Sequence, residues 1–456
     1  MAQSYGIRSN SVLATQLGAD KTSLVLHGLG AFERVLPHVE TLGWKLRRDV
    51  ASTKATWRDS NRRELRLTLA LVADETEWLV EGTLRRRQVP SGAGAISRTL
   101  DAREQQLATE ILRTLASLLQ EIPKDSAVAL HAVKARFDET VVAAHLQAHH
   151  EIKAPISDWF AQLRRMAEQT YENKALTFGC VIDRRSKAVP AEGCRFPDEF
   201  LARKRFRALS DGYRTAYRVS GAGAIVGFVS VRDTRGRQDG FFPEWSEALV
   251  AACREFGVGF ALTRQGDILV FDSGRLSFTY RFGRWQYWNH SHIVDLLRNF
   301  ARARHVHPGQ LAGVVRVIYR AALDVAFRRS GGLFVLLRSA DRASAIVREG
   351  DAIASPTRSA LDAQFDRAVA DAKITGIPRA VLAELAAIDG AVVVGNSGKL
   401  LAYGAVLDPK RKGRISAAEG SRTKAAIGAS YYGLAVKVSS DGDIEVYSKG
   451  QKLLSV

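Results

Sequence analysis

The feature that most constrains the fold is an alternation of strand and helix signals in the last third of the chain. Two apolar runs, Leu333–Leu337 and Ala391–Val394, have the length and composition of buried strands. Helical periodicity surrounds them, at residues 293–304, 310–329, 359–372 and 381–387. Short strands and glycine turns alternate from there to Val456. This order is typical of an α/β domain, in which helices flank a mixed, twisted sheet.

The residues before 294 mix strands and helices less regularly, which predicts two α+β regions. Strands are predicted at 24–26, 67–72, 176–182, 224–231, 267–271 and 276–280, with 281–285 turning into a further strand. Helices are predicted at 100–120 and 159–171. Asp272–Arg275 is predicted to form a hairpin turn. A break at Ile122–Ser126 and the start of the helical segment near 293 divide the chain into predicted domains 1–126, 127–293 and 294–456.

Length and composition agree with several globular domains. The chain has 456 residues, 46% of them hydrophobic and 25% charged, which excludes a mainly disordered protein and a small disulfide scaffold. The net charge of +18 favours anionic partners such as nucleotides, nucleic acid or acidic membranes, or marks a basic soluble protein. Three cysteines without a C-x-x-C pair indicate reduced thiols. With no signal peptide and no membrane span, the sequence predicts a cytoplasmic protein.

Three short motifs resemble known sites but lack essential parts. His27–Gly30 is like the oxyanion turn of α/β-hydrolases, but the chain has no G-x-S-x-G elbow, so a tight turn is predicted. Gly398-Lys399 lacks the spacing of a phosphate-binding loop, and Asn396–Lys399 is predicted to be a hairpin turn. Four histidines, at 290, 292, 305 and 307, have no nearby carboxylate or cysteine cluster. Capping or surface roles are therefore expected for them.

A basic stretch in the middle region is the candidate nucleic-acid contact. Six cations lie within sixteen residues: Arg203, Lys204, Arg205, Arg207, Arg214 and Arg218. Tyr213 and Tyr217 lie among them and could stack on bases. The alternative is a solvated face with no partner.

The most informative stretch begins at Asp389-Gly390-Ala391. An Asp and a Gly before a buried strand place a carboxylate at a sheet edge, which suits a hydroxyl or an Mg²⁺ contact. Further on, Gly420-Ser421-Arg422-Thr423-Lys424 leads into a helix rich in small residues. Backbone N–H groups at a helix start favour bound phosphate, as do neighbouring Arg and Lys side chains. The two segments together predict a nucleotide site.

In this order the segments resemble the diadenylate cyclase family, whose members make cyclic di-AMP from two ATP. Asp389-Gly390-Ala391 matches the family's D-G-A motif, and Gly420–Gly428 matches part of its G-T-R-H-R segment. Val438–Ile444 is loosely similar to the third motif, and Gly331–Arg338 looks like the first strand. The resemblance covers roughly residues 310–456. It implies a nucleotide site at Asp389, Gly390, Ala391, Gly420, Ser421, Arg422, Thr423 and Lys424.

Several departures from the family pattern concern catalysis. Ser421, Thr423 and Lys424 replace the family's Thr, His and second Arg. Tyr431 and Ser440 replace two glutamates, which predicts less charge for a metal. Mg²⁺ or Mn²⁺, expected only in an active enzyme, would be held by Asp389, with Asp441 as a substitute ligand. The phosphate-binding residues are better preserved, as in sensor-type members of the family.

Three functions therefore follow from the sequence. The first is a nucleotide sensor that recognises ATP or a cyclic dinucleotide. The second is an active diadenylate cyclase, in which Asp389 would be catalytic; because family members work with two sites face to face, this requires a homo-oligomer. The third is a nucleic-acid-binding module that uses the basic stretch, and it is compatible with the first.

Overall fold

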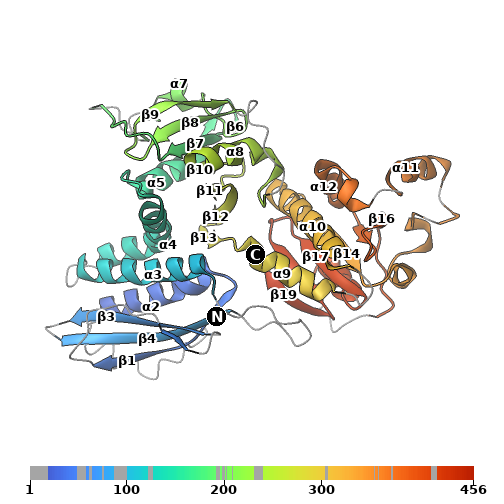
Figure 1. Cartoon of the computed structure of the whole chain (residues 1–456), viewed down its shortest axis with the longest axis horizontal. Helices are drawn as coiled ribbons and strands as arrows, with labels where there is room; N and C mark the ends of the chain where they lie inside the picture. Colours follow the sequence, from blue (N-terminus) through green and yellow to red (C-terminus); the bar gives the residue numbers. More distant parts are fainter. Residues whose placement is uncertain are drawn as a thin grey trace. The chain divides into compact units, whose positions relative to one another are not determined.

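The computed structural model describes residues 19–48, 58–60, 64–73, 76–86, 100–121, 127–191, 196–197, 201, 203–207, 209–230, 240–302, 307–353, 355–357, 359–370, 373–411 and 419–456. The chain divides into two compact units (Figure 1). Of the described residues, those within 19–86, 100–230 and 248–288 form unit 1, and those within 240–247 and 289–456 form unit 2. Both units mix helices and strands. The division into two units does not separate the residues before 126 from those after it, which both lie in unit 1. The three predicted domains therefore stay a prediction.

Unit 2 is built on a six-stranded sheet. Its strands are β14 (Gly332–Leu337), β15 (Ala391–Val394), β16 (Leu400–Ala405), β17 (Gly433–Val438), β18 (Ile444–Ser448) and β19 (Gln451–Ser455). Their order in the sheet is β16-β15-β14-β17-β18-β19. Strands β14 and β15 are parallel, and every other neighbouring pair is antiparallel. The sheet is therefore mixed, as the alternation of strands and helices predicted.

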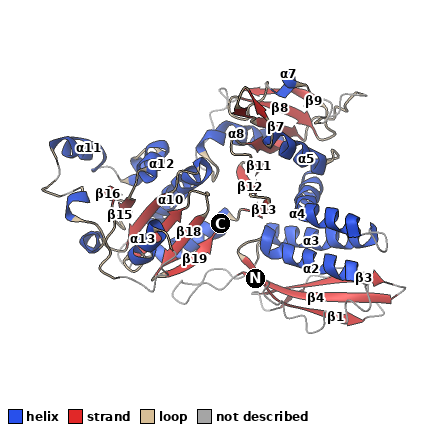
Figure 2. Cartoon of the chain, turned by 180° about the vertical axis from the view of Figure 1, so that it is seen from behind, coloured by secondary structure: helices blue, strands red, loops and turns tan. Residues whose placement is uncertain are grey.

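Helices cover both faces of this sheet (Figure 2). They are α9 (His290–Ala301), α10 (Pro308–Arg328), α11 (Ala360–Ala370), α12 (Arg379–Ala387) and α13 (Ser421–Ala429), with short 3₁₀ turns at Glu244–Ser246, Ala340–Ala345, Glu349–Asp351 and Ile374–Gly376. Leu333, Val335 and Leu337 of β14 share a core with residues of α13. Phe334 and Leu336 line a small void with residues of α9 and α10. Since successive strand side chains point to opposite faces, α13 covers one face and α9 and α10 cover the other.

Unit 1 contains two larger sheets and one two-stranded ribbon, β5 (Thr170–Tyr171) with β6 (Lys174–Ala175). The first sheet, in the order β1-β4-β3-β2, is antiparallel and consists of β1 (Val39–Arg48), β2 (Arg58–Ser60), β3 (Glu64–Ala73) and β4 (Thr76–Arg86). The second has the order β13-β12-β11-β10-β7-β8-β9. Its strands are β7 (Phe178–Asp183), β8 (Thr215–Ser220), β9 (Ile225–Ser230), β10 (Gly257–Leu262), β11 (Ile268–Asp272), β12 (Arg275–Arg281) and β13 (Arg284–Tyr287). This sheet is also mixed, because β7 and β8 are parallel.

Four helices of unit 1 share one hydrophobic core with strands of both sheets: α2 (Ala19–Val35), α3 (Ala102–Glu121), α4 (Ala127–His150) and α5 (Ile156–Ala167). The unit also contains α7 (Lys204–Arg207) and α8 (Glu247–Phe256). None of the helices in the described ranges combines the length and apolar composition that crossing a bilayer requires.

Most predicted elements are confirmed, but the helix predicted at 159–171 ends at Ala167, with Thr170–Tyr171 in β5, and the region around 24–30 is wrong. The hairpin predicted at Asp272–Arg275 joins β11 to β12, with Ser273 and Gly274 at positive φ. The turn predicted at Asn396–Lys399 joins β15 to β16. The strand predicted at 24–26 and the tight turn predicted at His27–Gly30 are both wrong, because these residues lie inside α2. The predicted break at 122–126 lies outside the described residues.

Candidate functional site

The candidate site lies at one edge of the sheet in unit 2. The parallel strands β14 and β15 both begin there, directly after Gly331 and Gly390. Strand β17 is antiparallel to β14 and ends there, because Val438 pairs with Gly332. The chain segments that precede two strands and follow a third therefore meet at this edge. The other edge is defined by the pairing of Leu337 with Gly433.

Arg422 and Asp389 come together at this edge. Arg422 Nη2 lies 3.9 Å from Asp389 Oδ1, so the predicted proximity of these residues is confirmed. The Asp389 side chain is fully exposed, whereas that of Arg422 is 34% exposed. A pair so open to water contributes little to folding, because solvent screens it. A ligand that contacts both the carboxylate and the guanidinium could therefore replace this ion pair at little cost in free energy.

Gly331 forms the surface on which Arg422 lies. Its φ is +69°, and a Cβ built at this position would lie 2.5 Å from Arg422 Nη1 and 3.6 Å from the Ser440 backbone nitrogen. The guanidinium is thus packed against bare main chain, beside the turn that follows β17. The sequence linked Ser440 to the site only through a missing metal ligand, and it gave Gly331 no role there. The consecutive glycines at 331 and 332, ahead of a strand, were the signal that could have indicated it.

Gly390 and Ala391 have a structural role in the geometry. Gly390 has a φ of +128°, and a Cβ there would lie 2.3 Å from the carbonyl carbon of Gly404. Only glycine allows β16 to pass this close to the start of β15. The Ala391 side chain is buried in the core that packs against α13. Ligand contacts at these two positions would therefore be limited to main-chain atoms.

The N-terminus of α13 is open to an anion. Gly420 is the N-cap residue and supplies no side-chain hydrogen bond to the first turn. The first N–H groups of a helix carry partial positive charge and need acceptors. Ser421 and Lys424 are exposed, and Thr423 is half-buried. These groups and Arg422 bring positive charge to the side on which Asp389 lies, and Glu419 directly precedes the N-cap.

Tyr431 lies at the other end of α13. Its ring packs against Gly450, where a Cβ would lie 2.2 Å from the phenol oxygen, and Arg411 lies 4.3 Å from the ring centroid. Gly450 follows β18, whose Ser448 pairs with Leu434 near the start of β17, at the opposite edge of the sheet from Asp389. Tyr431 therefore lies away from Asp389 within the chain, and its predicted effect on metal binding stays a prediction.

The metal ligands predicted at Asp389 and Asp441 stay a prediction. A divalent cation such as Mg²⁺ takes about six oxygen ligands, whereas Asp389 faces the positive charge of Arg422. Asp441 lies in the turn after β17, closed by a hydrogen bond from Gly442 N to Ser439 O of 3.0 Å. Among the described residues, three possible ligands gather at His149, His150 and Asp272 and not at this edge. The residues beside Asp389 do not by themselves fit a divalent metal.

The basic stretch of unit 1 does not present all its groups together. Arg203 and Arg214 are exposed, but Arg218 Nε lies 3.3 Å from Asp183 Oδ2. Tyr217 is fully buried and donates a hydrogen bond to Phe206 O. The prediction that its ring stacks on bases is therefore wrong. Arg207 donates to Gln169, and the side chains of Lys204 and Arg205 lie outside the described set. The nucleic-acid contact stays a prediction that rests on charge.

The histidines near α9 and α10 have structural contacts. His307 caps α10 by accepting a hydrogen bond from Gly309 N, as predicted for a capping residue. The capping or surface role expected for His290 and His292 is wrong, because both are buried and Asn289 caps α9. His290 Nδ1 lies 2.8 Å from the Tyr319 hydroxyl. His305 is outside the described residues.

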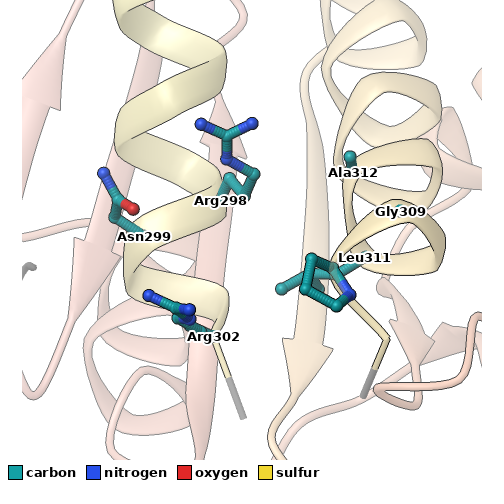
Figure 3. A pocket seen from close by; sticks show the side chains of 7 residues that line it. Arg298, Asn299, Arg302, Gly309, Leu311 and Ala312 are labelled. Carbon is teal, nitrogen blue, oxygen red and sulfur yellow. The ribbon is translucent and has the colours of Figure 1, made fainter.

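A cavity of about 380 Å³ opens between the last turn of α9 and the first turn of α10 (Figure 3). In this view Arg298 and Asn299 lie on α9, Arg302 directly follows it, and Gly309, Leu311 and Ala312 lie on α10. The 21 residues of α10 span about 30 Å at 1.5 Å per residue. The cavity is at the start of α10 and Gly331 follows its end, so the cavity is separate from the Asp389–Arg422 site.

Comparison with known proteins gives only distant similarities. No family model matches the chain, and no curated protein matches it. A solved structure of DacA from Staphylococcus aureus, a diadenylate cyclase, is similar with 21% identity and a TM-score of 0.21, covering 31% of this chain and 86% of that one. A hypothetical membrane spanning protein from Bacillus cereus is similar with 17% identity and a TM-score of 0.23, covering 36% of this chain and 74% of that one. At these values the two similarities support no conclusion about the site.

Proposed function

We propose that unit 2 binds a nucleotide, ATP or a cyclic dinucleotide, and acts as a sensor. The observation that carries this proposal is the convergence of Asp389 and Arg422 at one sheet edge, 3.9 Å apart, beside the open N-terminus of α13. The two segments are more than thirty residues apart in the sequence. Their meeting in space agrees with the motif order that resembles diadenylate cyclases.

The chemistry of the edge suits the two halves of a nucleotide. Arg422 and the first N–H groups of α13 would hold phosphate oxygens, because a guanidinium and a helix N-terminus both stabilise negative charge. Asp389 would accept a hydrogen bond from a ribose hydroxyl. Lys424 and Ser421 would add contacts to the same phosphates. The ligand would replace the solvent-screened contact between Asp389 and Arg422 with better-desolvated ones.

The arrangement supports binding better than turnover. Joining two ATP molecules is an in-line displacement that depends on metal ions at the phosphates. Asp389 already contacts the positive charge of Arg422, which disfavours a metal ion there. Ser440, in the turn beside Gly331, stands where the family pattern has a glutamate that could bind the metal. An active cyclase remains the alternative, in which Asp389 would help to activate the attacking hydroxyl.

Incubation of the full chain with ATP and Mg²⁺ or Mn²⁺ separates the two functions. The sensor predicts that bound ATP is recovered intact when the products are resolved by chromatography. Asp389→Asn should then change affinity alone. Formation of cyclic di-AMP by the wild-type chain, and its loss in Asp389→Asn, would replace the sensor with the cyclase.

A further inference from the structure

Unit 1 contains a cluster of potential metal ligands unrelated to the Asp389–Arg422 site. His149 and His150 are the last two residues of α4, and Asp272 is the last residue of β11. One ligand atom from each of these three side chains lies within 4.8 Å of the others. Figure 1 shows α4 beside β13 in the same unit. The cluster thus joins a helix end to the start of the β11–β12 hairpin turn.

The His150–Asp272 contact has the dimensions of two ligands on one ion. His150 Nε2 lies 3.2 Å from Asp272 Oδ1, and both side chains are about 95% buried. Apart from this contact with Asp272, the buried ring nitrogen has no hydrogen-bond partner among the described residues. Zn²⁺ binds nitrogen and oxygen at about 2.0–2.1 Å, so tetrahedral ligands lie about 3.3 Å apart. The 3.2 Å separation matches that edge.

The surroundings hold the ligands in place; Arg103 and Arg184 add positive charge nearby, whereas the end of α4 favours a cation. Arg103 Nη1 donates to Asp272 Oδ2 at 3.2 Å, and Ser273 Oγ donates to Oδ1 at 2.7 Å, which fixes the carboxylate. The His145 ring stacks on that of His149 with centroids 5.8 Å apart. The last carbonyls of a helix carry partial negative charge, which favours a positive ion at the end of α4.

Two features decide how an ion would enter. His149 is exposed, so its ring can move the short distance to the other two ligands and leave one position for water. Arg184 Nη1 lies 3.5 Å from His150 Nδ1 and would compete for that ring. When a metal binds His150 Nε2, the imidazole proton is on Nδ1, which can then no longer accept from Arg184. Arg184 is exposed, so its guanidinium can move into solvent.

We propose that His149, His150 and Asp272 bind one divalent transition-metal ion of the Zn²⁺ class, with water as the fourth ligand. Two imidazoles and one carboxylate are a donor set that suits Zn²⁺ or Co²⁺ better than Mg²⁺. The ion would tie the end of α4 to the β11–β12 hairpin and stabilise unit 1. This site is independent of the nucleotide site in unit 2.

The test uses the full chain without a histidine tag, after removal of metals with a chelator. Titration with Co²⁺ should produce the visible d–d absorption of a tetrahedral complex at one ion per chain, and Zn²⁺ should displace it. His149→Ala and Asp272→Asn should each weaken Zn²⁺ binding by at least about tenfold. His131→Ala, which removes an exposed histidine from the same helix, is the matched control and should bind as the wild type.

Several results would overturn the proposal. One is an absence of saturable Co²⁺ binding to the wild-type chain. Another is thiolate-to-cobalt charge-transfer absorption, which would place the ion on a cysteine. A third is unchanged Zn²⁺ affinity in folded His149→Ala, which decides the matter even where Asp272→Asn does not fold, because His149 is at the surface. Asp389→Asn should leave Zn²⁺ binding unchanged, which keeps this test separate from the nucleotide site.

Discussion

Two acidic side chains show how differently single residues are used in the two units. Asp389 is fully exposed and available to a ligand. Glu104 is fully buried in the first turn of α3, where it accepts hydrogen bonds from Arg86 Nη2 at 2.7 Å and from Asp101 N at 2.7 Å. Asp101 in turn accepts from Glu104 N at 3.0 Å, so the two residues form a reciprocal cap on α3. Glu104 thus stabilises the fold, whereas the exposed Asp389 is the residue that we propose contacts a ligand.

The pH dependence of stability should report Glu104. Burial raises its pKa, but His38 and Arg86 more than offset that effect and lower the pKa to about 2. A carboxyl with a lowered folded-state pKa stabilises the fold above its ordinary pKa of 4.5, and this contribution is lost as the pH falls towards 2. Urea unfolding should therefore show stability falling by up to about 1.4 kcal/mol per pH unit from this group.

Glu104→Gln should be less stable than the wild type at pH 7 and should show a shallower loss of stability in acid. Glu121→Gln, at the exposed end of the same helix, should keep the wild-type slope. Equal slopes for Glu104→Gln and the wild type would mean that Glu104 does not carry the acid sensitivity.

At the scale of elements, the site depends on a glycine that precedes a strand. Gly331→Ala places a Cβ at a φ of +69° and within 2.5 Å of the Arg422 guanidinium. The backbone conformation alone should cost about 1–2 kcal/mol of stability. Because Arg422 must move, nucleotide affinity should fall as well. Gly376→Ala, where a Cβ would meet nothing within 4 Å, is the control, and equal effects of the two changes on affinity would contradict the packing described for Arg422.

Elements defined by local pattern were predictable from the sequence, and those defined by packing were not. The periodicity of α3 and the turn of the β11–β12 hairpin are local signals. Inside α2, by contrast, Gly28 lies against Leu115, whose Cδ1 would be 2.8 Å from a Cβ. That contact with α3 explains a glycine within a helix, but it is invisible in the sequence around His27. A short apolar run such as 24–26 also fits either a strand or a helix.

The same limit applies to the site. Motif order brought Asp389 and Arg422 together correctly, because both lie at ends of elements with clear signals. The roles of Gly331 and Tyr431 depend on which edge of the sheet each residue occupies. Only the pairing of β14 with β15 and β17 determines those positions. The register of a sheet is set by long-range contacts.

At the scale of the whole molecule, the net charge of +18 favours anions in general. Tyr217 is buried, and Tyr213 is half-buried with Arg264 5.9 Å from its ring centroid, so we expect nucleic-acid binding by the basic stretch to be mainly electrostatic. We predict that such binding weakens steeply with salt, because each neutralised phosphate releases counterions. Replacing Arg203, Lys204 and Arg205 by Gln should flatten the dependence of log affinity on log salt. If the chain does not bind DNA or RNA, or if its binding does not depend on salt, the basic stretch is a solvated surface with no nucleic-acid partner.

The most direct test of the account is the affinity of the full chain for ATP and cyclic di-AMP, measured by calorimetric titration in the wild type and in Arg422→Ala. Loss of one charge-assisted hydrogen bond should weaken binding by about 1.5–3 kcal/mol. Arg342→Ala, which changes an exposed arginine in the 3₁₀ turn after the far end of β14, should bind as the wild type. Unchanged affinity in folded Arg422→Ala would place the nucleotide elsewhere and contradict the site.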